Sequence, residues 1–150
     1  MLETQTAVRE AAPPLNPRAG WPADLQQAYE DGRESGVVGT VLVSETEKVR
    51  VWHLSIPAGK RCGFHRHVLN YFWTALSDGR ARNYFEDGRI VDGDHYKGQT
   101  KHLNFGAGEY MVHCVENIGD TDLNFTTVEF LDSPNPPLPI PDDRRMRAPS

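Results

Sequence analysis

The sequence has few cysteines and no long apolar run. Two cysteines, Cys62 and Cys114, occur in 150 residues, which is too few for a disulfide-stapled scaffold. The longest apolar and aromatic stretch, YFWTAL at 71–76, is far shorter than the about 20 residues that span a bilayer. The opening MLETQTAVRE lacks the apolar core of a signal peptide. We therefore expect a cytoplasmic protein with reduced cysteines and no membrane partner.

A basic surface and the common nucleotide-binding motifs are also missing. The 16 Lys and Arg are outnumbered by 21 Asp and Glu, which gives a formal net charge of −5 with no basic stripe. This balance argues against a nucleic-acid groove. The absence of G-x-G-x-x-G and of a P-loop disfavours a dinucleotide or nucleotide site, and the absence of G-x-S-x-G disfavours a serine hydrolase.

Proline is plentiful at the two ends of the chain and scarce between them. Residues 1–36 contain AAPPLNPRAGWP and then PADLQQAYEDG, which predicts a short helix with Pro22 in its first turn and Gly32 just past its end. Residues 132–150 repeat proline too closely for helix or central strand. We interpret them as a solvated tail that is mobile or wraps a neighbouring subunit.

Residues 37–131 read as one all-β domain. KVRVWHLSI alternates Val49, Val51 and His53 with Arg50, Trp52 and Leu54, a period of two. Further short runs rich in aromatic and β-branched residues are separated by turn sequences such as SDG, EDG and NIGD. No amphipathic helix interrupts them, and residues 92–110 show no readable periodicity. The pattern predicts an antiparallel jelly roll closed into a barrel, which leaves no long edges.

Three histidines are candidates for one metal site. On a strand, His65 and His67 of RCGFHRH would share a face, so that both imidazoles could reach one ion. His113 lies in EYMVHCVEN between Met111 and Val115 on its own face, and a histidine on an inward apolar face needs a hydrogen bond or a metal. A buried, hydrogen-bonded histidine is the alternative for each of them.

These motifs resemble those of the cupin superfamily, whose members are small jelly-roll barrels of the double-stranded β-helix type. His65, His67 and Gly79 match the first cupin motif, and His113 with Asn117 match the end of the second. The run HRH-x3-Y closing in a DG turn is most similar to small single-domain bacterial cupins of the β-alanine degradation type. The motif's glutamate is replaced, because its position falls on Tyr71 or Phe72, and Tyr110 stands where the second motif has glycine. The resemblance thus implies a metal held by His65, His67 and His113 alone, as in a minority of cupins that include thiol and diketone dioxygenases.

Other residues could complete the site. Tyr71 could hydrogen-bond a bound ligand, act as an acid or coordinate as phenolate, or only pack with its hydroxyl at the rim. Trp73 would form an apolar wall of the pocket or belong to the core. His53 and His102 are further pocket candidates, His53 with surface or core placements left open. His95, in DGDHY, is expected in a solvated turn. By strand parity Cys62 and Cys114 face away from His65 and His113, as core filler.

Two functions follow from this set of residues. The first is an enzyme with one divalent transition metal (Fe, Ni, Zn or Mn) that acts on a small anionic metabolite as a dioxygenase or as an isomerase or lyase. The second is a non-catalytic cupin that binds or senses a small ligand. A purely structural protein is a third reading, in which the aromatic sheet is an oligomer interface. Because YFWTAL carries apolar residues on both faces, we expect at least a homodimer.

Overall fold

The structure is a computed structural model that describes residues 16–146. Within this range the chain forms one α-helix, one turn of 3-10 helix and nine strands. The strands are β1 (Val41–Glu45), β2 (Val49–Ile56), β3 (His65–His67), β4 (Tyr71–Ala75), β5 (Gly79–Phe85), β6 (Ile90–His95), β7 (Thr100–Leu103), β8 (Met111–Asn117) and β9 (Leu123–Phe130). The all-β prediction is confirmed. The first fifteen and last four residues of the predicted tails lie outside the described range.

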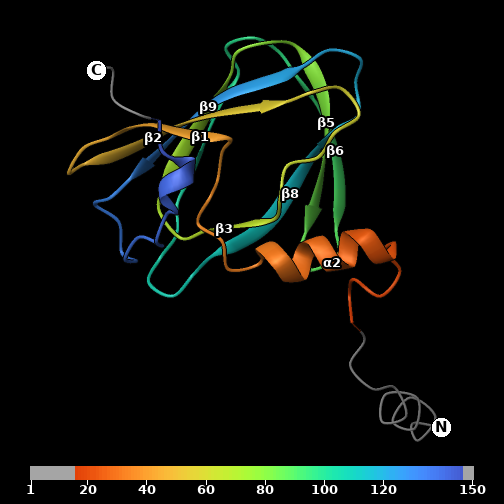
Figure 1. Ribbon diagram of the computed structural model, residues 1–150, viewed down its shortest axis with the longest axis horizontal. Coiled ribbons are helices and arrows are strands. Elements are labelled where there is room, and N and C mark those ends of the chain that lie inside the picture. The colour runs from red at the N-terminus through yellow and green to blue at the C-terminus, as the bar shows by residue number, and fades with distance from the viewer. Residues whose placement is uncertain (1–15, 147–150) are drawn as a thin grey trace, which may run out of the picture.

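The strands form two antiparallel sheets that face each other (Figure 1). One sheet has the strand order β1-β2-β9-β4-β7 and the other β3-β8-β5-β6. Among the described residues no strand pairing joins the two sheets, so the predicted closure into a barrel was wrong. Closure was expected because exposed edges aggregate, but charges protect the β6 edge instead, with Arg80 paired to Asp94 and Arg82 to Asp92.

The period of two in the sequence places the core between the sheets. In β2, Arg50, Trp52, Leu54 and Ile56 are buried while the intervening residues are partly exposed. β9 alternates in the same way. Six buried residues from both sheets form the main cluster: Leu54, Ile56, Ala75, Ala81, Leu123 and Phe125. Burying each large side chain of this kind contributes about 1.5–3 kcal/mol, so this layer holds the two sheets together.

Helix α2 (Ala23–Gly32) covers the outer side of the four-stranded sheet, below β8 in Figure 1. Its buried residues Leu25 and Tyr29 join Trp21, Phe64 and Cys114 in a second cluster. The helix was predicted, although Pro22 is its N-cap and Gly32 its last residue rather than the residue beyond it. An added Cβ at Gly32 would lie 2.2 Å from the carbonyl oxygen of Phe64, so glycine lets the helix approach the strand closely.

The C-terminal segment up to residue 146 is mostly exposed, as expected of a solvated tail, but several of its residues contact the five-stranded sheet. The carbonyl of Leu138 accepts a hydrogen bond of 3.0 Å from the buried Arg50 guanidinium. Ile140 packs against the cluster around Trp52, and Arg145 pairs with Glu45 after the short 3-10 helix η1 (Asp142–Arg144). Proline prevented a strand or α-helix here, as expected, but it did not prevent packing.

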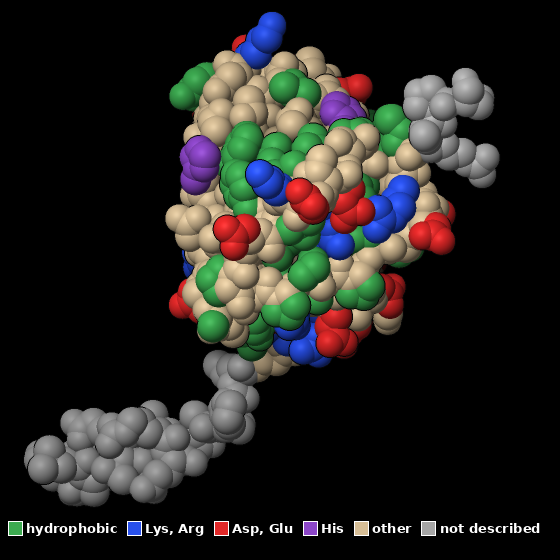
Figure 2. Space-filling model, turned by 90° about the vertical axis from the view of Figure 1, so that its left-hand side faces the viewer, with side chains coloured by type: hydrophobic (Ala, Val, Ile, Leu, Met, Phe, Trp, Pro, Cys, Tyr) green, Lys and Arg blue, Asp and Glu red, His purple; other side chains and the backbone are tan. Residues whose placement is uncertain are grey.

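Residues 92–110 contain the end of β6 and all of β7, which the sequence did not reveal. Both strands lie at sheet edges and are mostly exposed on both faces, so neither shows apolar alternation. Figure 2 views another side of the molecule, where hydrophobic side chains gather in the middle of the face with acidic and basic side chains interspersed among them. No helix in residues 16–146 is long and apolar enough to cross a membrane.

Candidate functional site

Strand register brings the three predicted histidines together. His65 and His67 lie two residues apart on β3 and therefore share its inner face. β3 pairs with β8 so that His113 is directly opposite His65. The ligand atoms of the three side chains lie within 4.8 Å of one another, close enough to hold one metal ion. The two strands thus supply the three imidazoles from distant parts of the sequence.

Backbone and amide oxygens fix the ring orientation of two of these histidines. His65 Nδ1 lies 3.0 Å from the carbonyl oxygen of Gly63, which can only accept, so Nδ1 carries the proton. His113 Nδ1 likewise lies 3.0 Å from Asn83 Oδ1. In both rings Nε2 then keeps its lone pair, as a metal ligand requires, and a carbonyl partner on the other nitrogen is typical of metal-binding histidines.

Burial keeps all three imidazoles neutral. It lowers the pKa of His65 to about 4. Burial also lowers the pKa of His67 and of His113 well below the usual value, and neighbouring histidines add to the effect. Because a metal competes with protons for the same lone pairs, these low pKa values leave the site ready to bind a cation near neutral pH.

Protein groups alone do not satisfy both ring nitrogens of His67. The contact between His67 and His113 tests whether a metal fits the site. His67 Nε2 lies 3.2 Å from His113 Nε2, which has no proton to offer if Asn83 holds the other nitrogen. His67 Nδ1 is buried and has no partner among the described residues. A metal bound through Nε2 would leave Nδ1 as it is, so the test of fit rests on the pair of Nε2 atoms, whose two lone pairs at 3.2 Å need a proton or a cation between them. Three neutral imidazoles fit iron, nickel, zinc or manganese and leave coordination positions open.

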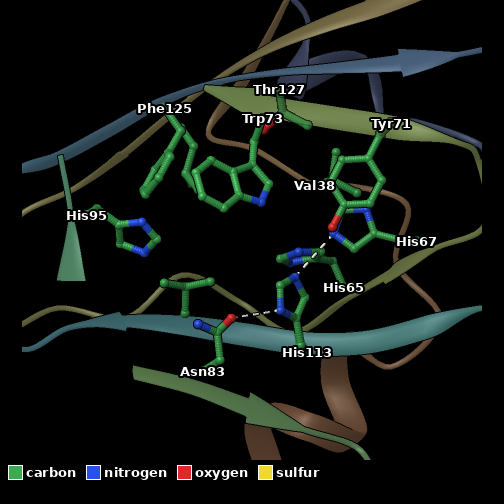
Figure 3. Close-up of a pocket in the computed structure, with 12 residues that line it drawn as sticks. Val38, His65, His67, Tyr71, Trp73, Asn83, His95, His113, Phe125 and Thr127 are labelled. Carbon is green, nitrogen blue, oxygen red and sulfur yellow. Dashed lines mark hydrogen bonds between the residues drawn. The ribbon is translucent and has the colours of Figure 1, made fainter. Parts of the chain in front are cut away.

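The three histidines form one end of a cavity of about 80 Å³ between the sheets (Figure 3). Tyr71, whose orientation the sequence left open, faces inward, and its ring stacks on that of His67 with centroids 4.1 Å apart and an interplanar angle of 7°. Its hydroxyl points toward the histidine group. Burial, aided by the charge of Glu129, raises the pKa of Tyr71, so the phenol form is favoured over phenolate. The apolar wall consists of Val38, Leu54, Trp73, Val115 and Phe125.

Two residues predicted for the pocket lie outside it. His53 is on the outer face of β2, opposite the buried Trp52 and Leu54. His102, on β7, is exposed and packs its ring on Phe72 at 5.1 Å, on the outer face of the sheet. The prediction placing them in the pocket is therefore corrected. Pairing of β7 with β4 sets Leu103 opposite Tyr71, which sends His102 the other way.

Two residues that the sequence analysis missed do line the cavity. His95, expected in solvent, ends β6 and faces the cavity beside Trp73 and Phe125. Asn83, on β5, was not considered at all and holds His113. Their strands carry no motif, and the alternation of β6 is masked at the sheet edge, so strand pairing alone reveals both residues.

The remaining motif residues and the cysteines serve the fold. Asn117 is fully buried and donates hydrogen bonds of 2.9 Å and 2.7 Å to the carbonyls of Ile56 and Thr121, which secures the turn after β8. Cβ at Gly79 would come within 2.5 Å of Leu123. Cys114 belongs to the cluster under α2 and faces away from His113, as predicted, and burial raises the pKa of its thiol.

Comparison with known proteins extends this description. No family model and no curated protein matches the sequence. Among solved structures, a cupin domain from Bordetella pertussis Tohama I is 25% identical, with a TM-score of 0.52 over 58% of this chain and 85% of that one. A cupin family protein with a double-stranded β-helix fold from Methanocaldococcus jannaschii is 20% identical, with a TM-score of 0.47 over 58% of this chain and 73% of that one.

A manganese-containing oxalate decarboxylase from Bacillus subtilis also matches, at 25% identity and a TM-score of 0.43 over 55% of this chain and 21% of that one. The fold assignment depends on the Bordetella domain, which aligns along most of its own length. It agrees with the two facing antiparallel sheets of this chain. The chain is therefore a small protein of the cupin superfamily.

Proposed function

We propose that this cupin is a metal-dependent enzyme that acts on a small anionic metabolite. The observation that carries the proposal is the convergence of His65, His67 and His113 within 4.8 Å at one end of the cavity between the sheets. These three side chains would hold one divalent transition metal. Dioxygenase chemistry at iron and isomerase or lyase chemistry at nickel, zinc or manganese are both compatible with nitrogen ligands alone.

The charge of the site favours an anionic substrate. Neutral imidazoles leave a bound divalent ion with its full charge, and the lining contains no Asp, Glu, Lys or Arg to offset or compete with it. When bound, such an ion supplies Lewis-acid polarisation or, in the case of iron, one-electron chemistry. A carboxylate, enolate or thiolate would therefore be drawn to the histidine end of the cavity.

The chain's own residues would orient the substrate and exclude water. Tyr71 presents a phenol whose raised pKa keeps its proton, so it acts as a hydrogen-bond donor beside the metal site rather than as a ligand. Trp73 and Phe125 wall the cavity with aromatic surface at a centroid distance of 5.4 Å. An apolar wall would strengthen electrostatic interactions at the histidine end.

A non-catalytic function in ligand binding or sensing is the second candidate. It is favoured by the lack of a carboxylate in the cavity lining, since this leaves only histidine and tyrosine for acid–base work. The two candidates share the metal and the ligand class, and they differ in whether the bound molecule is changed.

Turnover distinguishes the two candidates. Iron-, nickel- and zinc-loaded protein would be incubated with a panel of small acids, thiols and diketones, and oxygen consumption and product formation would be followed. We expect turnover with at least one metal, reduced about 10²–10⁴-fold in Tyr71→Phe, which keeps the stacked ring and loses the donor. Saturable binding without turnover would support the sensing function, and neither turnover nor binding would contradict both.

Three further expectations from the sequence stay proposals. These are the cytoplasmic location, the absence of nucleic-acid and membrane partners, and the homodimer. The closer resemblance to β-alanine degradation cupins is a prediction of the same standing, to be tested with that pathway's acids in the substrate panel.

A further inference from the structure

The end of the cavity opposite the metal site carries a fourth histidine. Figure 3 shows the His95 ring pointing into the cavity, with Trp73 between it and the three-histidine group. Trp73 and Phe125 each meet this ring edge to face, both at a centroid distance of 5.2 Å and at angles of 82° and 89°. Packing by two aromatic rings holds the imidazole in a fixed orientation.

The tautomer of His95 leaves an acceptor for a ligand. Its Nδ1 lies 2.8 Å from Gln99 Oε1, and an amide oxygen can only accept, so Nδ1 carries the proton. The lone pair is then on Nε2, which has no hydrogen-bond partner among residues 16–146. A ring nitrogen that lines a cavity in this state can accept a hydrogen bond from a bound molecule.

Asn83 adds donors to the same space. Its Oδ1 is occupied by His113 at 3.0 Å, which fixes the orientation of the amide. Figure 3 shows the Asn83 nitrogen pointing away from His113, on the side of the cavity toward His95. No residue in the described part of the chain accepts from this nitrogen. The cavity therefore presents a metal site at one end and, beyond it, unpaired N–H groups and an imidazole lone pair.

From this arrangement we infer that the substrate is a short hydroxy acid, with its carboxylate at the metal end and its hydroxyl at His95. This inference rests on the proposed function. A hydroxyl can donate to His95 Nε2 and can also accept from Asn83. An ammonium group cannot accept from Asn83 and would be repelled by the divalent ion. A methyl group would leave the imidazole and the amide unpaired.

The size of the cavity limits the length of the acid. A cavity of about 80 Å³ is small beside the roughly 300–1,000 Å³ of pockets that take drug-sized ligands. A short acid of a few carbon atoms therefore suits this space better than a sugar or a nucleotide.

Isothermal titration calorimetry on the zinc-loaded full chain tests the inference with three probes of one shape. These are 3-hydroxybutyrate, 3-methylbutyrate and 3-aminobutyrate, each as both enantiomers where they exist. We expect the hydroxy acid to bind about tenfold more tightly than the methyl analogue, and the amino acid no more tightly than the methyl analogue. In His95→Phe, which keeps the aromatic packing, the tenfold preference should fall to about one. In His102→Phe, the exposed matched control, it should persist.

Zinc content measured in the same samples distinguishes a failure of this inference from a failure of the proposed function. Zinc bound to the wild type with equal affinity for the hydroxy and methyl acids would overturn the inference and leave the metal site intact. A tenfold preference that survives in His95→Phe would overturn the role of His95. If that variant does not fold, His95→Gln is used instead, and the wild-type comparison stands without any substitution. Absence of zinc would contradict the proposed function and the inference with it.

Discussion

A buried glutamate beside the site gives the sharpest prediction about stability. Glu129 is 3% exposed and accepts a hydrogen bond of 2.7 Å from the indole nitrogen of Trp52. Its strand neighbour across the sheet is Tyr71. Burial raises the pKa of Glu129 from 4.5 to about 7, against the opposing effects of the Trp52 hydrogen bond and the charge of Arg50. We therefore expect the folded protein to prefer the protonated acid.

The sign and size of the effect on stability follow from this raised pKa. Between pH 4.5 and pH 7 the folded chain holds a proton at Glu129 that the unfolded chain has released, so the free energy of unfolding falls as pH rises. The contribution is fully present below pH 4.5 and lost above pH 7. A shift of this size corresponds to about 3 kcal/mol in all, of which about 2–3 kcal/mol is lost between pH 5 and pH 8.

Glu129→Gln tests this reasoning, because glutamine keeps an acceptor for Trp52 and does not titrate. Guanidinium unfolding of the metal-free protein at pH 5, 6, 7 and 8 would give the stability difference between wild type and variant. The buried histidines titrate equally in both and cancel in this difference. The advantage of the wild type should shrink by about 2–3 kcal/mol from pH 5 to pH 8. Glu47→Gln, at an exposed position, should show no such trend, and parallel curves for Glu129→Gln would refute the argument.

Three further predictions concern the site and the assembly. Asn83→Ala should weaken zinc binding about 10–100-fold, because His113 loses the partner that orients its ring. Competition with a chromophoric chelator measures the affinity. An unchanged affinity would contradict the role of Asn83 in orienting His113. Zinc affinity should change little between pH 8 and pH 6, because burial lowers the pKa of the three histidines. A site of three imidazoles with ordinary pKa values would lose about 60-fold in zinc affinity over this range. A loss of that size would count against the buried site. Light scattering of the wild type should give twice the chain mass of 16.9 kDa. Val128 lies beside Phe72 on the partly buried outer face of β9, and Val128→Glu should give a monomer. A monomeric wild type would rule out the dimer.

Much of the fold could be predicted because the inner strands alternate visibly. The period of two identified β2 as a strand with two distinct faces, and parity placed His65 and His67 together. The edge strands β6 and β7 could not be found this way, because residues exposed on both faces carry no apolar alternation. Closure of the barrel was overestimated, since the argument from sticky edges ignores protection by charged side chains.

The residues of the site were also predictable only where a motif or the alternation along one strand marks them. His65, His67 and His113 were identified from motif residues, Tyr71 from its place at the motif's glutamate position, and Trp73 from its position two residues beyond Tyr71 on the same strand face. The placement of the other residues depends on the register of strand pairing, which the sequence does not reveal. This register turns His102 outward and brings His95 and Asn83 to the cavity. Glu129 was missed because a single acidic residue in a hydrophobic strand gives no sign of its partner Trp52, 77 positions away.

The metal content of the protein purified without a histidine tag tests the central claim most directly. Elemental analysis should find close to one equivalent of a transition metal per chain in the wild type and in His102→Ala, which removes an exposed histidine outside the cavity. His113→Ala should lose the metal while circular dichroism shows an intact β-sheet fold. Equal metal content in His113→Ala and in the wild type would contradict the three-histidine site.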